Sequence, residues 1–280
     1  MRDWRSIGIV LLAVAVGALP ASAQGTKCTP GIVCVSQVQG EGGMQFLLRK
    51  LTPGALTMRI QVEGENVTTT APMPYVRTLD DTSRVHAFVV QPEEGTSGVD
   101  YTYAYQAQYG RIDAQHDDTY RYALPYARGT THRVAQGYGG NGTHRGIYAI
   151  DWTMPVGTPV HAARPGLVVA VRDSMEGSGI SRYMQGRSNF VFIEHRDGTI
   201  GLYGHLQAES AAVAVGDTVR RGDRLARSGN TGYSSGPHLH FEVFRLNETL
   251  MPDTLPVRFD AVGAPARGLD PGRRYSVTAQ

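Results

Sequence analysis

The sequence predicts an all-β protein with an N-terminal β-sandwich followed by a domain built on an antiparallel β-sheet with long loops. Apolar and polar residues alternate in short runs, which is the period of a half-buried strand rather than of a helix. Turn-forming Gly, Pro, Asp and Asn separate these runs. With 280 residues, 41% of them hydrophobic, the chain is long enough to bury two modest cores.

The first 23 residues are typical of a secretory signal. Arg2 and Arg5 precede an apolar run from 7 to 19, and the small residues Ala21-Ser22-Ala23 follow it. The run is too short to span a bilayer comfortably, and no later segment is long enough. We expect residues 1–23 to be a signal peptide cut after Ala23, so that the mature protein is periplasmic or secreted without a stable membrane span. An uncleaved anchor is the alternative.

The two cysteines, Cys28 and Cys34, follow the expected cut. Pro30-Gly31 between them favours a tight turn that brings the thiols together. In an oxidising compartment we expect a disulfide, with two free buried thiols as the alternative.

Residues 24–125 are expected to form the β-sandwich, whose role the sequence does not indicate. The segment 124–129 is interpreted as a linker because it combines Pro and Gly. The strands expected in this half are 44–48, 56–62, 85–90 and 101–105.

The second domain is expected over 126–250, with 251–280 as an extension packed on it. A polar, Gly-rich stretch from 172 to 188 is interpreted as a long surface loop. The strands expected here are 159–163, 166–171, 190–193, 199–206 and 238–243.

Composition excludes several classes of function. The net charge of +2 is too small to indicate a nucleic-acid partner. The sequence has no Gly-x-Ser-x-Gly elbow and no Walker motif, so serine hydrolases and nucleotide-binding proteins have no support.

The pair His238-Leu239-His240 carries the most chemical information. On a strand, residues i and i+2 project from one face, so both imidazoles reach one space while Leu239 and Phe241 face a core. Two histidines placed in this way suit a metal ligand and a neighbour that handles protons.

The stretch from 228 to 242, a Gly-rich turn that runs into His238-Leu239-His240-Phe241-Glu242, resembles the last motif of the LytM/lysostaphin-type zinc metallopeptidases, the M23 family. Three further segments match the family's pattern in the family's order, and together the resemblance covers roughly residues 130–245. They are Gly157-Thr158-Pro159-Val160, Tyr203-Gly204-His205-Leu206 and Val215-Gly216-Asp217-Thr218.

The resemblance implies a zinc ion held by His144, Asp151 and His240, with His205 and His238 in catalytic roles. Two His and one Asp leave the fourth tetrahedral position open for water, which is the catalytic arrangement. Zinc lowers the pKa of such a water to about 7, and a histidine can accept its proton.

One spacing departs from the family's common pattern, His-x-Gly-x-Asp. Counting from His144, that pattern would place the Asp where Tyr148 stands, whereas counting back from Gly157 reaches Asp151. His132 is therefore kept as the alternative first ligand. Glu242 either orients a ligand or is a solvated charge at the end of a strand.

The resemblance implies an exported zinc metalloendopeptidase that hydrolyses the peptide cross-links of bacterial peptidoglycan, with stem peptides or cross-bridges as its partners. The alternative is a non-catalytic module that binds peptidoglycan or regulates a hydrolase on the same fold. The complete ligand set favours the enzyme.

Overall fold

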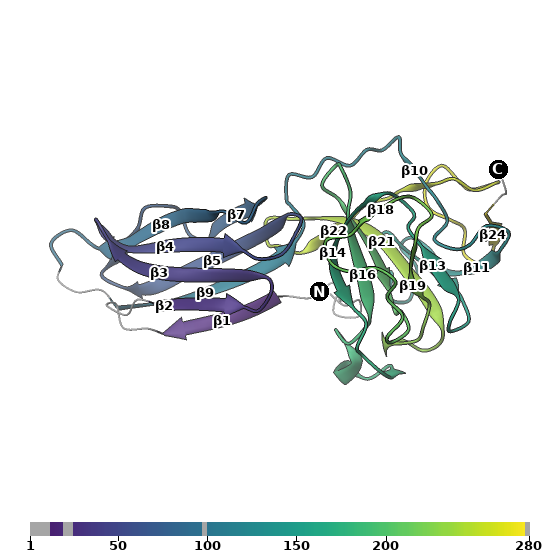
Figure 1. Ribbon diagram of the computed structural model, residues 1–280, viewed down its shortest axis with the longest axis horizontal. Coiled ribbons are helices and arrows are strands. Elements are labelled where there is room, and N and C mark those ends of the chain that lie inside the picture. The colour runs from purple at the N-terminus through teal and green to yellow at the C-terminus, as the bar shows by residue number, and fades with distance from the viewer. Residues whose placement is uncertain (1–11, 19–24, 97–99, 278–280) are drawn as a thin grey trace. The chain divides into compact units, whose positions relative to one another are not determined.

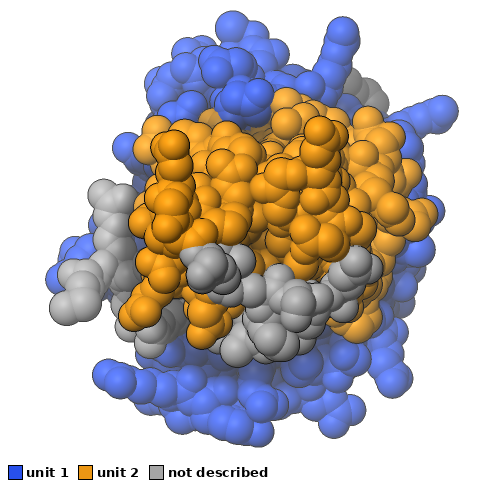
Figure 2. Space-filling model, turned by 90° about the vertical axis from the view of Figure 1, so that its left-hand side faces the viewer, with its two compact units in different colours: residues 1–10, 113–247, 252–280 blue, residues 11–112, 248–251 orange. Residues whose placement is uncertain are grey.

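The computed structural model describes residues 12–18, 25–96 and 100–277, and its strands confirm the all-β class (Figure 1). Within these residues the one helical element is the 3-10 turn η2 at Arg182–Met184. No helix in the described part of the chain is long and apolar enough to cross a bilayer. The chain divides into two compact units, one formed mainly by Leu11–Ile112 and the other mainly by Asp113–Asn247 and Pro252–Gln280 (Figure 2).

The N-terminal unit is a sandwich of two antiparallel sheets. One sheet has the order β1-β9-β5-β7, with β1 at Leu12–Ala18, β9 at Asp100–Tyr109, β5 at Leu56–Glu65 and β7 at Tyr75–Leu79. The other has the order β2-β3-β4-β8-β6, with β2 at Gly25–Thr29, β3 at Val33–Gly40, β4 at Gly43–Lys50, β8 at Arg84–Pro92 and β6 at Val67–Thr69.

Aromatic side chains fill the space between these two sheets. Phe46 on β4 stacks on Phe88 of β8 at 4.6 Å between ring centroids, and it meets the edge of Tyr103 of β9 at 5.1 Å. Alternation along β9 places Tyr101, Tyr103 and Tyr105 inside, each at most 3% exposed. The expected sandwich is therefore observed.

Cys28 and Cys34 form a disulfide, as expected. They are directly opposite each other on β2 and β3, which are joined by the turn that contains Pro30 and Gly31. Gly31 has a φ of 70°, a conformation that glycine adopts without steric cost.

The C-terminal unit is built on one antiparallel sheet with the order β18-β14-β16-β17-β21-β12-β11-β24. Its strands are β18 at Thr218–Val219, β14 at Gly166–Arg172, β16 at Phe190–Glu194, β17 at Ile200–Gly204, β21 at His238–Leu246, β12 at Ala149–Thr153, β11 at Thr131–Gln136 and β24 at Arg274–Ser276. The smaller pairs are β22 (Pro252–Thr254) on β21, β10 (Arg121–Tyr122) with β23 (Arg258–Phe259), β13 (Pro159–His161) with β19 (Arg224–Arg227), and β15 (Ser178–Gly179) with β20 (Gly232–Tyr233).

Strand β21 lies in the middle of this sheet, between β17 and β12. Its residues Leu239, Phe241 and Val243 are at most 1% exposed and belong to the apolar core, together with Trp152 of β12 and Tyr203 of β17. The intervening residues of β21 therefore project from the opposite face of the sheet.

The segment 124–129 is not a linker, so this interpretation of the sequence was wrong. Leu124 and Tyr126 are each 2% exposed in the core of the C-terminal unit, and the Tyr126 hydroxyl donates to the carbonyl of Tyr275. Period-two alternation of Tyr122, Leu124 and Tyr126 buries the segment despite its Pro and Gly.

The expected loop 172–188 is largely irregular, but it contains β15 and η2. The extension after residue 250 contributes Phe259, Leu269 and Tyr275 to the core. Of the expected signal peptide, Leu12–Ala18 form strand β1, paired with β9. The cut after Ala23 lies outside the described residues and stays a prediction.

Candidate metal centre

The register of β12 and β21 brings the expected strand ligands together. Asp151 is the cross-strand partner of His240, and Thr153 is the partner of His238. Directly opposite residues on antiparallel strands project from the same face. Asp151 Oδ1 accordingly lies 2.8 Å from His240 Nδ1.

His144 reaches the same place from the loop before β12. Its imidazole is fully buried, its Nδ1–H donates to the carbonyl of Gly137 at 3.1 Å, and its Nε2 lies 3.1 Å from Asp151 Oδ2. The long spacing to Asp151 is taken up by a turn in which Ile147 N–H donates to the His144 carbonyl and Gly146 has a φ of 73°. Tyr148, which holds the position where the common spacing requires Asp, is 44% exposed.

The structure therefore brings together His144, Asp151 and His240, and one potential ligand atom from each lies within 4.8 Å of the others. All three residues are at most 7% exposed. Among the described residues this is the one group of three or more His, Cys, Asp or Glu side chains with such convergence.

The donor set fits zinc. Two imidazole nitrogens and one carboxylate oxygen make a three-ligand zinc site that leaves one position open. The Nε2 atom of His144 is buried and forms no hydrogen bond of good geometry, although it lies near Asp151. A buried polar atom without a partner is costly, and a metal ion would provide the partner.

The electrostatics of the cluster also favour a cation. Burial alone would raise the pKa of Asp151, but the contacts with His144 and His240 hold it well below its usual range. Burial alone would lower the pKa of His240, but the carboxylates of Asp151 and Glu242 raise it to about 9. Such a site stabilises positive charge, and a bound metal would replace the proton.

Glu242 is a buried partner of His240 rather than a solvated charge. It is 3% exposed, and its Oε2 lies 3.4 Å from His240 Nε2. A carboxylate on the second ring nitrogen fixes which nitrogen of a histidine faces a metal. Here that leaves Nδ1 facing Asp151.

His205 and His238 stand beside the cluster with their rings 4.5 Å apart. The Nδ1–H of His205 donates to the Thr231 carbonyl at 2.7 Å, and that of His238 donates to the Gly236 carbonyl at 2.8 Å. These bonds leave the lone pair of each ring on Nε2. Burial, with His238 and His240 nearby, lowers the pKa of His205 to about 3, so its imidazole is neutral at neutral pH.

The backbone at His205 is itself unusual, with a φ of 59° just after β17. A non-glycine residue in the left-handed region costs about 1–3 kcal/mol and is concentrated at functional sites. The backbone N–H of His205 donates to Ser188 Oγ at 3.0 Å, which helps to hold this conformation.

These side chains line a groove of about 940 Å³ on the C-terminal unit. One wall comes from the loop between β11 and β12, and the other from the turn before β21 together with Ile180 of the long loop. Asp151, His205, His238 and His240 all contact the groove. A volume of this size is typical of sites that bind small ligands.

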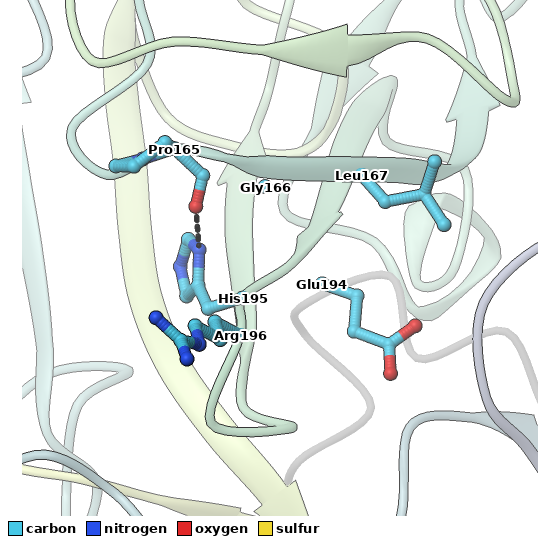
Figure 3. A pocket seen from close by; sticks show the side chains of 6 residues that line it. All are labelled: Pro165, Gly166, Leu167, Glu194, His195 and Arg196. Atoms are coloured by element: carbon cyan, nitrogen blue, oxygen red, sulfur yellow. Dashed lines mark hydrogen bonds between the residues drawn. The ribbon is translucent and has the colours of Figure 1, made fainter.

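The remaining histidines lie elsewhere. His132, the alternative ligand, packs against the ring of Tyr126 at 4.7 Å and is not part of the cluster. His161 donates from Nδ1 to the Gly222 carbonyl. His195 follows β16, and its Nδ1 donates to the Pro165 carbonyl (Figure 3).

The hollow in Figure 3, of about 470 Å³, contains none of the clustered residues. Its lining residues are Pro165, Gly166, Leu167, Glu194, His195 and Arg196. His195 is held by Pro165, and no second histidine stands near it in the hollow. We assign no chemistry to it.

Sequence reasoning did not identify the polar residues that support the histidines. Ser188, Thr231 and Ser234 are at most 6% exposed and hydrogen-bond His205 or His238. Gln136 donates to Asp151. Small polar residues in Gly-rich loops are common, and no signal in the sequence distinguishes these four residues.

Comparison with known proteins agrees with this site. The model of peptidase family M23 matches residues 144–252. An uncharacterized metalloprotease of Haemophilus influenzae is 34% identical over 163 residues, covering 54% of this chain and 31% of that protein. The peptidoglycan DD-endopeptidase ShyA of Vibrio cholerae is 38% identical over 93 residues, covering 33% of this chain and 19% of that protein. The matched part thus spans less than a third of the length of these relatives.

Two similar solved structures are the catalytic domain of the M23 protein EnpA from Enterococcus faecalis and that of lysostaphin from Staphylococcus simulans. The first is 27% identical with a TM-score of 0.36, covering 50% of this chain and 98% of that chain. The second is 30% identical with a TM-score of 0.31, covering 48% and 85%. The matched family model spans the three clustered residues and both neighbouring histidines. Through residues 144–252, the chain belongs to peptidase family M23.

Proposed function

We propose that this protein is an exported, zinc-dependent endopeptidase that hydrolyses peptide cross-links of bacterial peptidoglycan. The observation that carries the proposal is the convergence of His144, Asp151 and His240 beside a groove that Asp151 and His240 line together with two further histidines. The family match and the endopeptidase activity named for relatives such as ShyA support the substrate class.

His144, Asp151 and His240 would hold the zinc ion. When bound, zinc supplies Lewis-acid chemistry, which lowers the pKa of water to about 7 and polarises a carbonyl group. The protein's part is to present two imidazoles and one carboxylate from a loop and two strands that packing keeps fixed.

His205 and His238 carry the proton chemistry. Each ring keeps its proton on Nδ1, donated to a backbone carbonyl, and therefore offers Nε2 as the acceptor. One Nε2 accepts the proton of the attacking water and later gives a proton to the leaving amine of the peptide. The Nε2 lone pair of the other ring accepts a second hydrogen bond from this water and so orients it for attack.

The groove suits an extended peptide. Its walls carry glycines and small polar residues at 140–143 and 234–236, whose short side chains leave room for a substrate strand. An enzyme that cuts the peptide cross-links of the cell wall works outside the cytoplasm, which agrees with the signal peptide expected at residues 1–23 and with the Cys28–Cys34 disulfide.

The competing proposal is a non-catalytic module that binds peptidoglycan or regulates a hydrolase. A binding module has no need of three converging ligand atoms or of two adjacent histidines with fixed tautomers. Their presence favours the enzyme.

The direct test is digestion of purified peptidoglycan by the mature chain, with products separated and identified as muropeptides. We expect cross-linked dimers to be converted to monomers, loss of activity with a chelator, and restoration on adding about one zinc per chain. Binding to peptidoglycan without any new muropeptide, at full zinc occupancy, would support the non-catalytic module instead.

A further inference from the structure

Gln136 joins the two segments that carry the first and second members of the metal cluster. It ends strand β11 and is the cross-strand partner of Asp151 on β12. Its side-chain amide Nε2 donates to Asp151 Oδ2 at 3.1 Å and to Thr143 Oγ1 at 2.9 Å. Thr143 immediately precedes His144 in the loop. One amide group thus bridges the strand of Asp151 and the loop of His144.

The backbone next to Gln136 contacts the cluster as well. The carbonyl of Gly137 accepts the hydrogen bond from His144 Nδ1. The dipeptide Gln136-Gly137 therefore fixes the Asp151 carboxylate through a side chain and the His144 tautomer through a carbonyl.

The loop between β11 and β12 is shaped around this side chain. A Cβ atom added at Gly142 would lie 2.5 Å from Gln136 Oε1, and one added at Gly140 would lie 2.8 Å from Gln136 Cγ. Glycine at both positions lets the loop pass close to the amide. Gln136 lines the groove, but both N–H groups of its amide are engaged within the protein and its Oε1 faces these glycines.

We propose that Gln136 is a positioning residue for the metal centre, one that sets the metal affinity by orienting Asp151 and holding the His144 loop against it. This inference rests on the proposed zinc-dependent function. Gln136 precedes the segment matched by the family model, so that segment alone lacks this contact. Hydrogen bonds to a ligating carboxylate commonly contribute 10- to 100-fold to metal affinity.

The test is the zinc dissociation constant of the full mature chain, measured by competition with a chromophoric chelator. Gln136→Met keeps the length of the side chain and removes its donors, and we expect the dissociation constant to rise about 10- to 100-fold. Thr143→Val removes only the loop contact and should give a smaller rise. Gln207→Met is the matched control, because Gln207 is half-buried in the same unit but does not line the groove, and its affinity should equal that of the wild type.

Two further readouts separate positioning from other roles. KM measured at saturating zinc should be unchanged in Gln136→Met, because the amide N–H groups are held by Asp151 and Thr143 rather than offered to the groove. Circular dichroism of the metal-free variants should match the metal-free wild type. If Gln136→Met fails to fold, Thr143→Val must still weaken zinc binding relative to Gln207→Met.

Unchanged zinc affinity in Gln136→Met and Thr143→Val would overturn the proposal while leaving the zinc peptidase intact. Unchanged affinity with a raised KM would assign Gln136 to substrate binding instead. A wild type that binds no zinc would overturn the proposed function, and this inference with it.

Discussion

Two carboxylates of the C-terminal unit, Asp151 and Asp197, are similar in charge and in side-chain exposure, at 10% and 11%, but differ in their partners. Asp197 accepts hydrogen bonds from Arg164 at 2.7 Å and from the Thr199 hydroxyl at 2.7 Å. Arg164 in turn donates to the Tyr122 hydroxyl and lies over the ring of Tyr120. Around Asp197, donors and acceptors are matched within the protein.

Asp151 has a different environment. It faces two imidazoles, and the Nε2 atom of His144 beside it is buried without a well-formed hydrogen bond. The cluster around Asp151 contains two carboxylates and several imidazole lone pairs. The cluster around Asp197 instead pairs a carboxylate with the guanidinium of Arg164. A cation from outside the chain would complete the first arrangement, as we propose, whereas the second is complete within the protein. A candidate metal site is therefore indicated by buried ligand atoms that converge and have no complete set of partners within the protein.

An unpartnered nitrogen alone is not sufficient for that conclusion. His132 and His195 also have a buried Nε2 atom without a hydrogen-bond partner. His132 packs on Tyr126, and His195 meets the ring of Tyr122 at 5.8 Å. What distinguishes His144 is that two other ligand atoms converge on the same point.

The largest expected effect separates His144 from His132. His144→Ala should abolish tight zinc binding and activity, because it removes one of three ligands. His132→Ala should keep one zinc per chain, because His132 contacts an aromatic ring and no member of the cluster. The zinc content of both variants is measured by atomic emission in parallel with that of the wild type. The reverse result would make His132, and not His144, the first ligand.

A smaller effect, on the free energy of unfolding, is expected from substitution of Asp197. Burial alone would raise the pKa of Asp197, but hydrogen bonds from Asp117 and Thr199 and the charge of Arg164 lower it to about 2. The carboxylate therefore stabilises the fold above its ordinary pKa of about 4, and this contribution is lost as the pH falls through about 2. Asp197→Asn should lower the free energy of unfolding by about 2 kcal/mol at neutral pH and leave zinc binding unchanged.

The deficit of Asp197→Asn should shrink as the pH falls from 4 toward 2. Urea unfolding followed by tryptophan fluorescence measures it, because Trp152 is fully buried in this unit and is the single tryptophan once residues 1–23 are removed. A deficit that stayed constant over this range would mean that the ion pair with Arg164 contributes nothing through the charge of Asp197.

Several strands with regular alternation were predicted from the sequence, but β3, which also alternates regularly, was not. Strand β21 is the best case, because Leu239, Phe241 and Val243 alternate with His238 and His240, and the side-chain directions followed directly. The short strands β11 and β24 were not predicted, since three to six residues without regular alternation do not differ from loop sequence.

Of the site, the residue types and the shared face of β21 could be predicted, and the motif resemblance supplied the rest of the set. The contacts of Gln136 could not be predicted, because they depend on the pairing of β11 with β12 and on the path of a Gly-rich loop. The burial of Leu124 and Tyr126 was missed because Pro and Gly were given more weight than the alternation of their neighbours.

We propose that two histidines of strand β21 have different roles, with His240 as a metal ligand and His238 as a proton carrier. The most direct test measures zinc content and muropeptide cleavage rate on the same preparations of His238→Ala and His240→Ala. We predict that His240→Ala loses both zinc and activity. His238→Ala should retain about one zinc per chain and lose about 100- to 10,000-fold in turnover, as expected for a missing general base. Loss of zinc from His238→Ala would contradict the account, because it would make His238 a ligand.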